Sequence, residues 1–218
     1  MNDFIIKMLV YVLPLIVAIV LHEISHGLAA YALGDDTAKR MGRFKLHTHF
    51  DLLGSFLIPI VLYLIKSPIL VGYAKPVPVN PNNFKKPWLD MAIVAIAGPL
   101  CNAILAVFGA LFLKNFMLNA PILLQQIMVN FIATNLVLLF FNMIPIPPLD
   151  GSRIMAALLP PKFRMTYYRL ESFGFLLVIG LDLLSMKIFD LLGIHGGSLF
   201  NLLIGVPVHR SLDLLLFN

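Results

Sequence analysis

Two histidines and a glutamate lie within residues 20–28, VLHEISHGL, one of the most apolar stretches of the chain. In a helix, His22 and His26 stand four residues apart on one face, so both imidazoles can reach one metal ion. In the pattern HExxH the glutamate, here Glu23, accepts a proton instead of binding the metal. The alternative is a polar patch satisfied by helix packing. Glu23 is one of only two glutamates in the chain, and two histidines with an acid on one intramembrane face favour a functional site.

A catalytic zinc ion normally takes three protein ligands and leaves one position for water, so the motif lacks one ligand. The best candidate is Asp150 in FNMIPIPPLDGSR, where Pro145, Pro147 and Pro148 make a regular helix improbable. A carboxylate at such an interrupted helix end can turn inward, whereas the alternative is an ordinary Asp-Gly turn at the membrane boundary. We therefore expect one Zn²⁺ per chain, bound by His22, His26 and Asp150.

The composition is that of an integral membrane protein. Of the 218 residues 60% are hydrophobic and 12% are charged, and the mean hydropathy is +0.91. The single cysteine excludes an internal disulfide and does not suggest a thiolate metal site. The net charge of +5 comes from basic residues between apolar runs, which indicates topology signals and not nucleic-acid binding. We expect one membrane domain over residues 1–218, with a catalytic core at about 5–160 and C-terminal helices at about 165–218.

Four apolar runs predict helices at residues 5–33, 91–113, 122–146 and about 170–192, and residues 198–217 either span or lie in the interface. Residues 52–73 are apolar enough to span but carry Pro59, Lys66, Pro68 and Gly72. The predicted fold is an all-α polytopic membrane protein, a bundle of four to six transmembrane helices with a re-entrant or short β segment after the first helix.

The topology depends on whether residues 52–73 cross the membrane. If they re-enter, residues 34–90 and 147–169 share one side with twelve basic residues, and only Lys7 and Lys114 face the other side. The positive-inside rule favours this arrangement over a full crossing, which divides the charges five against eight. The first and third helices then run in the same direction, which brings His22 and Asp150 to one depth. This topology predicts an active site towards the cytoplasmic side of a bacterial or archaeal cell membrane.

Three motifs in order resemble the site-2 protease family of intramembrane zinc metalloproteases. They are HEISH at 22–26, AGPLCNA at 97–103, which resembles GPxxN, and NMIPIPPLDG at 142–151, which fits NxxPxPxxDG. The segment GYAKPVPVN is similar to the family's re-entrant strand region. The resemblance implies zinc ligation by His22, His26 and Asp150, and Glu23 as the general base. It also implies the compact branch of the family, without a PDZ-like or CBS-like module.

The resemblance also suggests residues that contact the substrate. Asn142 is expected to hold the substrate or the oxyanion, although asparagine is also common in helix–helix contacts. Val77 and Val79 belong to a strand edge that could hold an unwound substrate by β-augmentation. Pro145 belongs to the third motif. Asn102 either contacts the substrate or packs between helices.

The predicted function is hydrolysis of peptide bonds within or near transmembrane segments, in a membrane-tethered regulator or a signal-peptide remnant. The expected partners are a transmembrane substrate and the lipid bilayer, with no nucleic acid, and the oligomeric state is left open. The alternatives are a metal-ion transporter or channel with the same intramembrane cluster, and a catalytically silent scaffold. A second cluster in HTHFD, His47, His49 and Asp51, has a spacing that permits metal binding, although a solvated loop or a helix cap fits it better.

Overall fold

The structure, a computed structural model, describes residues 3–49, 54, 57–58, 60–61, 65 and 75–217. The described part is almost entirely helical and contains no strand, as the prediction of an all-α membrane fold requires. Three of its helices are long and apolar enough to cross a membrane, Ile5–Ala32, Pro87–Met117 and Ile122–Asn142, and a bent pair over residues 161–191 makes a fourth if it acts as one span. The prediction of four to six spans is therefore met only if the bent pair counts as one span.

The first span begins with α1 (Asp3–Lys7) and a π-helical turn (Met8–Val12) and continues as α2 (Leu13–Ala32). Pro14 lies in the first turn of α2, where a missing N–H is tolerated. The chain leaves α2 at Gly34, whose φ of 105° lies in the left-handed region that glycine adopts freely. Two short elements follow, α3 (Thr37–Arg40) and a 3₁₀ turn (Leu46–His49).

The second and third spans form a long antiparallel pair. A 3₁₀ turn (Pro81–Asn83) leads into α5 (Pro87–Phe112), which continues as a π-helical turn (Leu113–Met117). Pro87 occupies the first turn, and Asp90 accepts a hydrogen bond from the Lys86 N–H at 2.8 Å, so α5 begins four residues earlier than hydropathy predicted. α6 (Ile122–Asn142) ends four residues before the predicted position, because the residue before Pro145 disfavours helical geometry.

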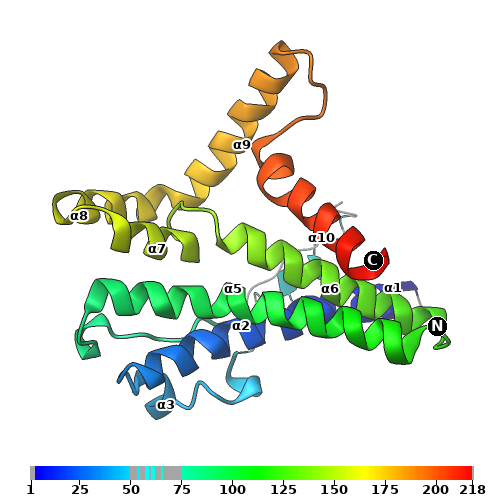
Figure 1. The fold of residues 1–218 in the computed structure, drawn as a ribbon, viewed down its shortest axis with the longest axis horizontal. Helices are drawn as coiled ribbons and strands as arrows, with labels where there is room; N and C mark the ends of the chain where they lie inside the picture. Colours follow the sequence, from blue (N-terminus) through cyan, green and yellow to red (C-terminus); the bar gives the residue numbers. More distant parts are fainter. Residues whose placement is uncertain are drawn as a thin grey trace.

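Contacts along the helices establish their directions. Leu21 contacts Cys101, His26 contacts Val94, and Ala30 packs with Phe84 and Val94, so α2 and α5 are antiparallel. α5 and α6 are antiparallel as well, and α2 and α6 therefore run in the same direction (Figure 1). The C-terminal end of α2 and the N-terminal end of α5 therefore meet. The re-entrant path predicted for the chain between them stays a prediction.

In the C-terminal third, hydropathy predicted the helices near residues 170–192 and 198–217 but not the two shorter helices before them. α7 (Asp150–Leu158) and α8 (Pro161–Arg169) follow the proline-rich turn, and a 3₁₀ turn (Leu170–Phe173) leads to α9 (Gly174–Leu191). α9 projects from the bundle, and the chain returns through a π-helical turn (Asn201–Gly205) and α10 (Val206–Phe217) to the side of α6 (Figure 1). Asp182 and Ser185 of α9 accept hydrogen bonds from Phe200 N and Leu199 N and so fix the returning chain.

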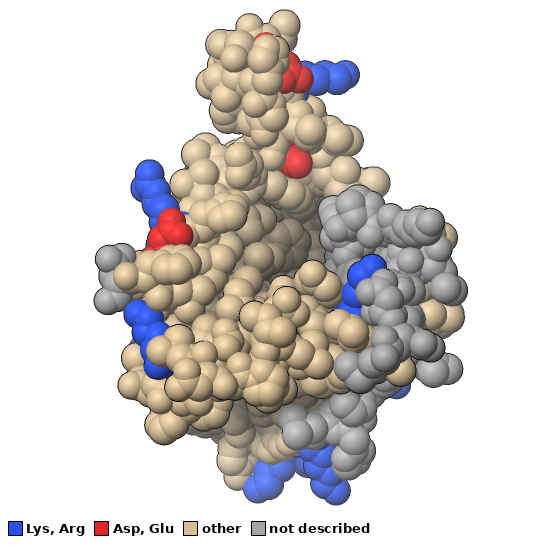
Figure 2. All heavy atoms as spheres, turned by 90° about the vertical axis from the view of Figure 1, so that its right-hand side faces the viewer, with Lys and Arg blue, Asp and Glu red and all other residues tan. Residues whose placement is uncertain are grey.

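The predicted re-entrant or short β segment at residues 52–73 lies mostly outside the described residues. The described continuation, residues 75–80, forms neither helix nor strand, so a β segment is not confirmed. Figure 2 looks along the three long helices from the end at which α5 joins α6. Most of the described surface visible there carries neither acidic nor basic side chains.

Candidate active site

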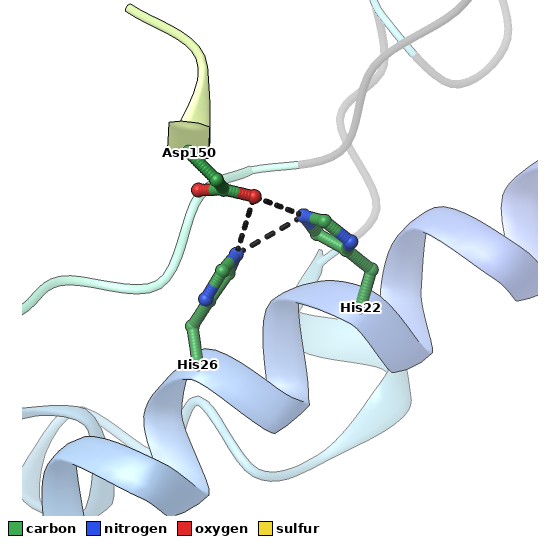
Figure 3. Close-up of side chains that lie close together, drawn as sticks. All are labelled: His22, His26 and Asp150. Atoms are coloured by element: carbon green, nitrogen blue, oxygen red, sulfur yellow. Dashed lines mark hydrogen bonds and ion pairs between the residues drawn. The ribbon is translucent and has the colours of Figure 1, made fainter. Parts of the chain in front are cut away.

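α2 and α7 bring three possible metal ligands together from residues far apart in sequence (Figure 3). The Nε2 atoms of His22 and His26 lie 3.0 Å apart, and Asp150 Oδ2 lies 3.1 Å from the first and 3.3 Å from the second. Both histidines are buried, with 6% and 8% of their surface exposed. It is the one cluster of potential metal ligands found within the part of the chain that the structure describes.

The outer nitrogens of both rings face acceptors. His26 Nδ1 lies 2.7 Å from the carbonyl oxygen of Val94, and His22 Nδ1 lies 2.6 Å from Asn102 Oδ1. Each Nδ1 therefore carries a proton and donates it, which in a neutral ring leaves Nε2 with only a lone pair. Asp150 Oδ2 is buried and receives no hydrogen bond from the described residues.

Three lone-pair atoms thus converge at about 3 Å with no neutral donor among them. Such an arrangement is repulsive unless a cation, a proton or a metal ion, lies among the three atoms. Two imidazoles and one carboxylate are also the ligand chemistry of a catalytic zinc site, so these residues fit a zinc ion.

Two glycines allow the helices to approach closely enough to form the cluster. A Cβ on Gly98 of α5 would lie 2.5 Å from both His22 Cε1 and His26 Nε2. A Cβ on Gly151 would lie 2.3 Å from the carbonyl oxygen of Met143 at the end of α6. Gly98 therefore seats the two imidazoles against α5, and Gly151 lets α7 start directly beside the end of α6. The Asp-Gly pair here begins a helix and is not a simple turn.

A cavity of about 360 Å³ opens on the cluster. Glu23 lines it beside the histidines, and its Oε2 accepts a hydrogen bond from the N–H of Val77 at 2.9 Å. The opposite wall is largely apolar and comes from residues 76–81, from α5 and from the turn before α7. The site therefore combines a potential metal centre, a carboxylate and an apolar wall on which a hydrophobic peptide can lie.

The other predicted site residues divide into two groups. Asn142, Val77 and Val79 line the cavity. Asn102 and Pro145 are not among the residues that line it: Asn102 is fully buried behind His22, and the Pro145 carbonyl oxygen accepts a hydrogen bond from the Tyr167 hydroxyl at 2.8 Å. Substrate contact by Asn102 and Pro145 stays a prediction, and their observed contacts favour supporting roles.

Sequence reasoning missed three residues that shape the site. Among the described residues Arg153 is the one arginine or lysine that lines the cavity, and its guanidinium lies 3.4 Å from Glu171 Oε1. The sequence contains a signal for this residue, because Arg153 follows Asp150 by three residues and would share a helix face with Asp150. Asn135 lies behind Asn102, and Asp35 holds the segment that carries Val77. Neither belongs to a motif, so only the tertiary contacts reveal them.

Asp35 anchors the wall of the cavity to the end of α2. Its carboxylate is fully buried and accepts hydrogen bonds from Asn80 N at 2.7 Å, from Asn83 Nδ2 at 2.6 Å, and from both the backbone N–H and the hydroxyl of Thr37. Burial raises the pKa of this carboxyl, and these hydrogen bonds outweigh burial and leave the pKa below its ordinary value. The segment before α5 is thus fixed at two points, at Val77 by Glu23 and at Asn80 by Asp35.

Only the His49 side chain of the second predicted cluster is described, so metal binding there stays a prediction. His49 is fully buried, and its ring nitrogens lie 2.7 Å from the Arg43 carbonyl oxygen and 3.2 Å from the Lys75 carbonyl oxygen. These contacts tie the chain after α3 to the start of the cavity wall. Asp51 and the side chain of His47 lie outside the described part of the structure.

Comparison with known proteins agrees with this geometry. The sequence profile of Peptidase family M50 matches residues 10–121, which include HEISH and AGPLCNA. A relative from Bacillus subtilis (strain 168), described as "Putative zinc metalloprotease YwhC", is 40% identical over 177 residues, which cover 77% of each chain. The chain belongs to peptidase family M50. As an M50 peptidase it is a membrane-embedded zinc metallopeptidase, and the predicted membership of the site-2 protease family is confirmed. No solved structure matches it.

The matched range of the family profile ends before Asp150, so the profile match does not include the predicted third ligand. Family membership implies a zinc ion, and the cluster of His22, His26 and Asp150 is where this M50 peptidase can bind one. The family gives no support to the transporter alternative.

Proposed function

We propose that His22, His26 and Asp150 hold the catalytic zinc ion of this peptidase and that Glu23 is its general base. The observation that carries the proposal is the convergence of three lone-pair atoms, two Nε2 and one Oδ2, within 3.3 Å of one another. A buried group of acceptors without a neutral donor requires a cation, and the family supplies its identity as zinc.

Peptide hydrolysis in a bilayer needs water, a Lewis acid and an exposed substrate backbone. Zinc, when bound, supplies the Lewis acid, since it polarises the scissile carbonyl and lowers the pKa of water to about 7. Glu23 accepts the proton of the attacking water and delivers it to the leaving amide nitrogen. Its hydrogen bond with the Val77 N–H holds one carboxylate oxygen in place, and the carboxylate keeps other lone pairs for this proton.

Asn142 is a suitable donor to the oxyanion. One N–H of its side-chain amide donates to the Leu138 carbonyl oxygen at 3.0 Å, and the second N–H remains for the substrate. Its position in the cavity lining supports this role. Preorganised donors of this kind typically contribute a factor of about 10² to 10³ in kcat.

The substrate is a transmembrane segment that unwinds at the site, because a helix hides its carbonyls in hydrogen bonds between residues i and i−4. Residues 76–79 are suited to hold the unwound chain. Pro76 and Pro78 restrict their own φ and the geometry of the residues before them, which keeps the segment extended. Val77 and Val79 face the cavity and supply apolar contacts. The substrates are membrane-tethered regulators or signal-peptide remnants, cleaved towards the cytoplasmic side of the cell membrane.

Zinc content and cleavage of a single-span substrate, measured on the same purified samples, test the assignment. We expect about one zinc ion per chain in the wild type and in Glu23→Gln, with cleavage lost in Glu23→Gln. Asp150→Asn should lose both zinc and cleavage. Zinc at the wild-type level in Asp150→Asn would remove Asp150 from the ligand set, and cleavage by Glu23→Gln would exclude Glu23 as the base.

The role of residues 76–79 has its own test. Deletion of Val77–Asn80 should abolish cleavage of a transmembrane substrate while zinc remains bound, because the zinc ligands lie on α2 and α7. Intact cleavage in the deletion variant would refute a role of this segment in holding the substrate.

A further inference from the structure

A line of buried amide groups runs from His22 into the bundle. Asn102 of α5 places Oδ1 2.6 Å from His22 Nδ1 and donates from Nδ2 to Asn135 Oδ1 of α6 at 2.8 Å. Asn135 in turn donates from Nδ2 to the Phe131 carbonyl oxygen at 2.8 Å. Both asparagines are fully buried, with 0% exposure. Three helices thus contribute to one chain of hydrogen bonds that ends on a potential zinc ligand.

The polarity of this chain is fixed from its far end. A backbone carbonyl can only accept, so Asn135 must present its NH₂ group to Phe131 and its oxygen to Asn102. Asn102 must then present NH₂ to Asn135 and its oxygen to His22. His22 Nδ1 therefore has to be the protonated nitrogen, and Nε2 has to carry the lone pair that faces Asp150 and His26.

His26 reaches the same state more simply, because its Nδ1 donates directly to the Val94 carbonyl oxygen. His22 has no backbone carbonyl as its Nδ1 partner and depends on Asn102, whose amide would accept or donate equally well if free to turn. Asn135 removes that ambiguity. Tautomer control by a hydrogen-bonded partner of this kind typically changes metal affinity 10- to 100-fold.

We propose that Asn102 and Asn135 are positioning residues for zinc binding, a relay that holds His22 in the tautomer whose Nε2 faces the ion. The inference rests on the proposed role of His22 as a zinc ligand. In this relay Asn102 contacts the proposed zinc ligand His22 and not the substrate. It also gives a function to Asn135, which no motif includes.

Zinc affinity, measured by chelator competition on the purified full chain in detergent, tests the relay without reference to cleavage. We expect Asn102→Leu to weaken zinc binding about 10- to 100-fold. Asn135→Leu should weaken zinc binding less than Asn102→Leu does, by about 3- to 10-fold. In this variant the Asn102 amide can turn and present NH₂ to His22 for part of the time. The matched control is Asn130→Leu. Asn130 makes the same bond to the carbonyl four residues earlier, at 2.9 Å to Gln126, but does not touch Asn102 or His22, and zinc affinity should not change.

Two further variants separate the relay from simple helix packing. Because Asn135 acts through Asn102, the double variant Asn102→Leu/Asn135→Leu should bind zinc as Asn102→Leu does. Asn102→Asp keeps an acceptor for the His22 Nδ1–H and should bind zinc at least tenfold more tightly than Asn102→Leu. If the two asparagines only pack helices together, the losses of zinc affinity should add in the double variant, and Asn102→Asp should bind zinc no better than Asn102→Leu. Either result would overturn the proposal.

The failure of the relay is distinguishable from failure of the zinc site itself. His22→Leu should abolish high-affinity zinc binding. If His22→Leu loses zinc while Asn102→Leu binds it as the wild type does, the zinc site stands and the relay is wrong. If His22→Leu retains zinc at wild-type affinity, both the proposed ligand set and the relay are overturned. Should Asn102→Leu fail to fold, the comparison of Asn135→Leu with Asn130→Leu decides the question.

Discussion

Gly98 determines how closely α5 can approach the two histidines of α2. A methyl group at this position would meet His22 Cε1 and His26 Nε2 at 2.5 Å, well inside van der Waals contact. Both rings are buried and tied through Nδ1, so neither can move aside without losing a hydrogen bond. The small residue at the zinc-facing surface of α5 is therefore part of the site.

Gly98→Ala should displace at least one imidazole and reduce zinc affinity by at least tenfold, with a matching loss of cleavage. The measurement is zinc competition on the purified variant. Gly180→Ala is the matched control, a helical glycine of α9 whose added Cβ would meet nothing within 4 Å. Wild-type zinc affinity in Gly98→Ala would mean that α5 is free to move away from α2.

At the residue scale, the sequence reveals the three predicted metal ligands but not the residues that support them. HEISH and the proline-flanked Asp150 carry distinctive local spacing, and the structure brings these three side chains together. Asn135 and Gly98 act through contacts with α5 and α2 that join residues 33 or more positions apart. No local pattern distinguishes a buried asparagine that orients a ligand from one that packs two helices together.

At the element scale, the segment between α2 and α5 is held by Asp35. Four donors converge on its carboxylate, and each such bond to a charged group contributes about 1.5–3 kcal/mol. Asp35→Asn puts an NH₂ group among these donors. We expect a loss of about 2–3 kcal/mol in stability, seen as a lower unfolding midpoint, and slower cleavage because the cavity wall loosens. Asp36→Asn is the control, since Asp36 is half exposed and forms its ion pair with Arg40 in the next turn.

The same contacts predict an acid dependence. The pKa of Asp35 is lower in the folded than in the unfolded chain, so its contribution is fully present above the ordinary value of 3.8 and is lost as pH falls towards the folded pKa. The difference in unfolding midpoint between wild type and Asp35→Asn should therefore shrink as pH falls below about 4. A difference that stays constant with pH would exclude an ionised Asp35 as its source.

Hydropathy predicts the three long spans, because each needs a continuous run of about 20 apolar residues. It does not predict α7 and α8, since they are nine residues each and partly polar. The end of α6 and the start of α7 depend on proline geometry and on the close contact of Gly151 with Met143. These features of the chain after residue 142 position Asp150.

At the scale of the whole molecule, zinc should join α2 to α7 and so stabilise the fold. A ligand that binds only the folded state adds RT ln(1 + [L]/Kd), about 4 kcal/mol when free zinc exceeds Kd a thousandfold. Removal of zinc by a chelator should therefore lower the unfolding midpoint of the wild type by roughly 10 °C. Asp150→Asn should show little response to the same chelator. An equal shift in both proteins would place the stabilising metal elsewhere.

The directions of the helices also predict which segments share a side of the membrane. α2 ends and α5 begins at one side, and α6, which runs parallel to α2, delivers α7 and α8 to that same side. Residues 118–121, between α5 and α6, lie at the other side. Segments 34–90 and 147–169 hold twelve basic residues, so the positive-inside rule predicts that their side of the membrane is the cytoplasmic one. In a Cys101→Ala background, Arg40→Cys and Lys162→Cys in intact bacterial cells should resist a membrane-impermeant maleimide and react with a permeant one. Asn119→Cys, in the turn between α5 and α6, should react with both. Labelling of only one of positions 40 and 162 from outside would contradict the shared side, and a complete reversal would place the zinc site towards the outer face.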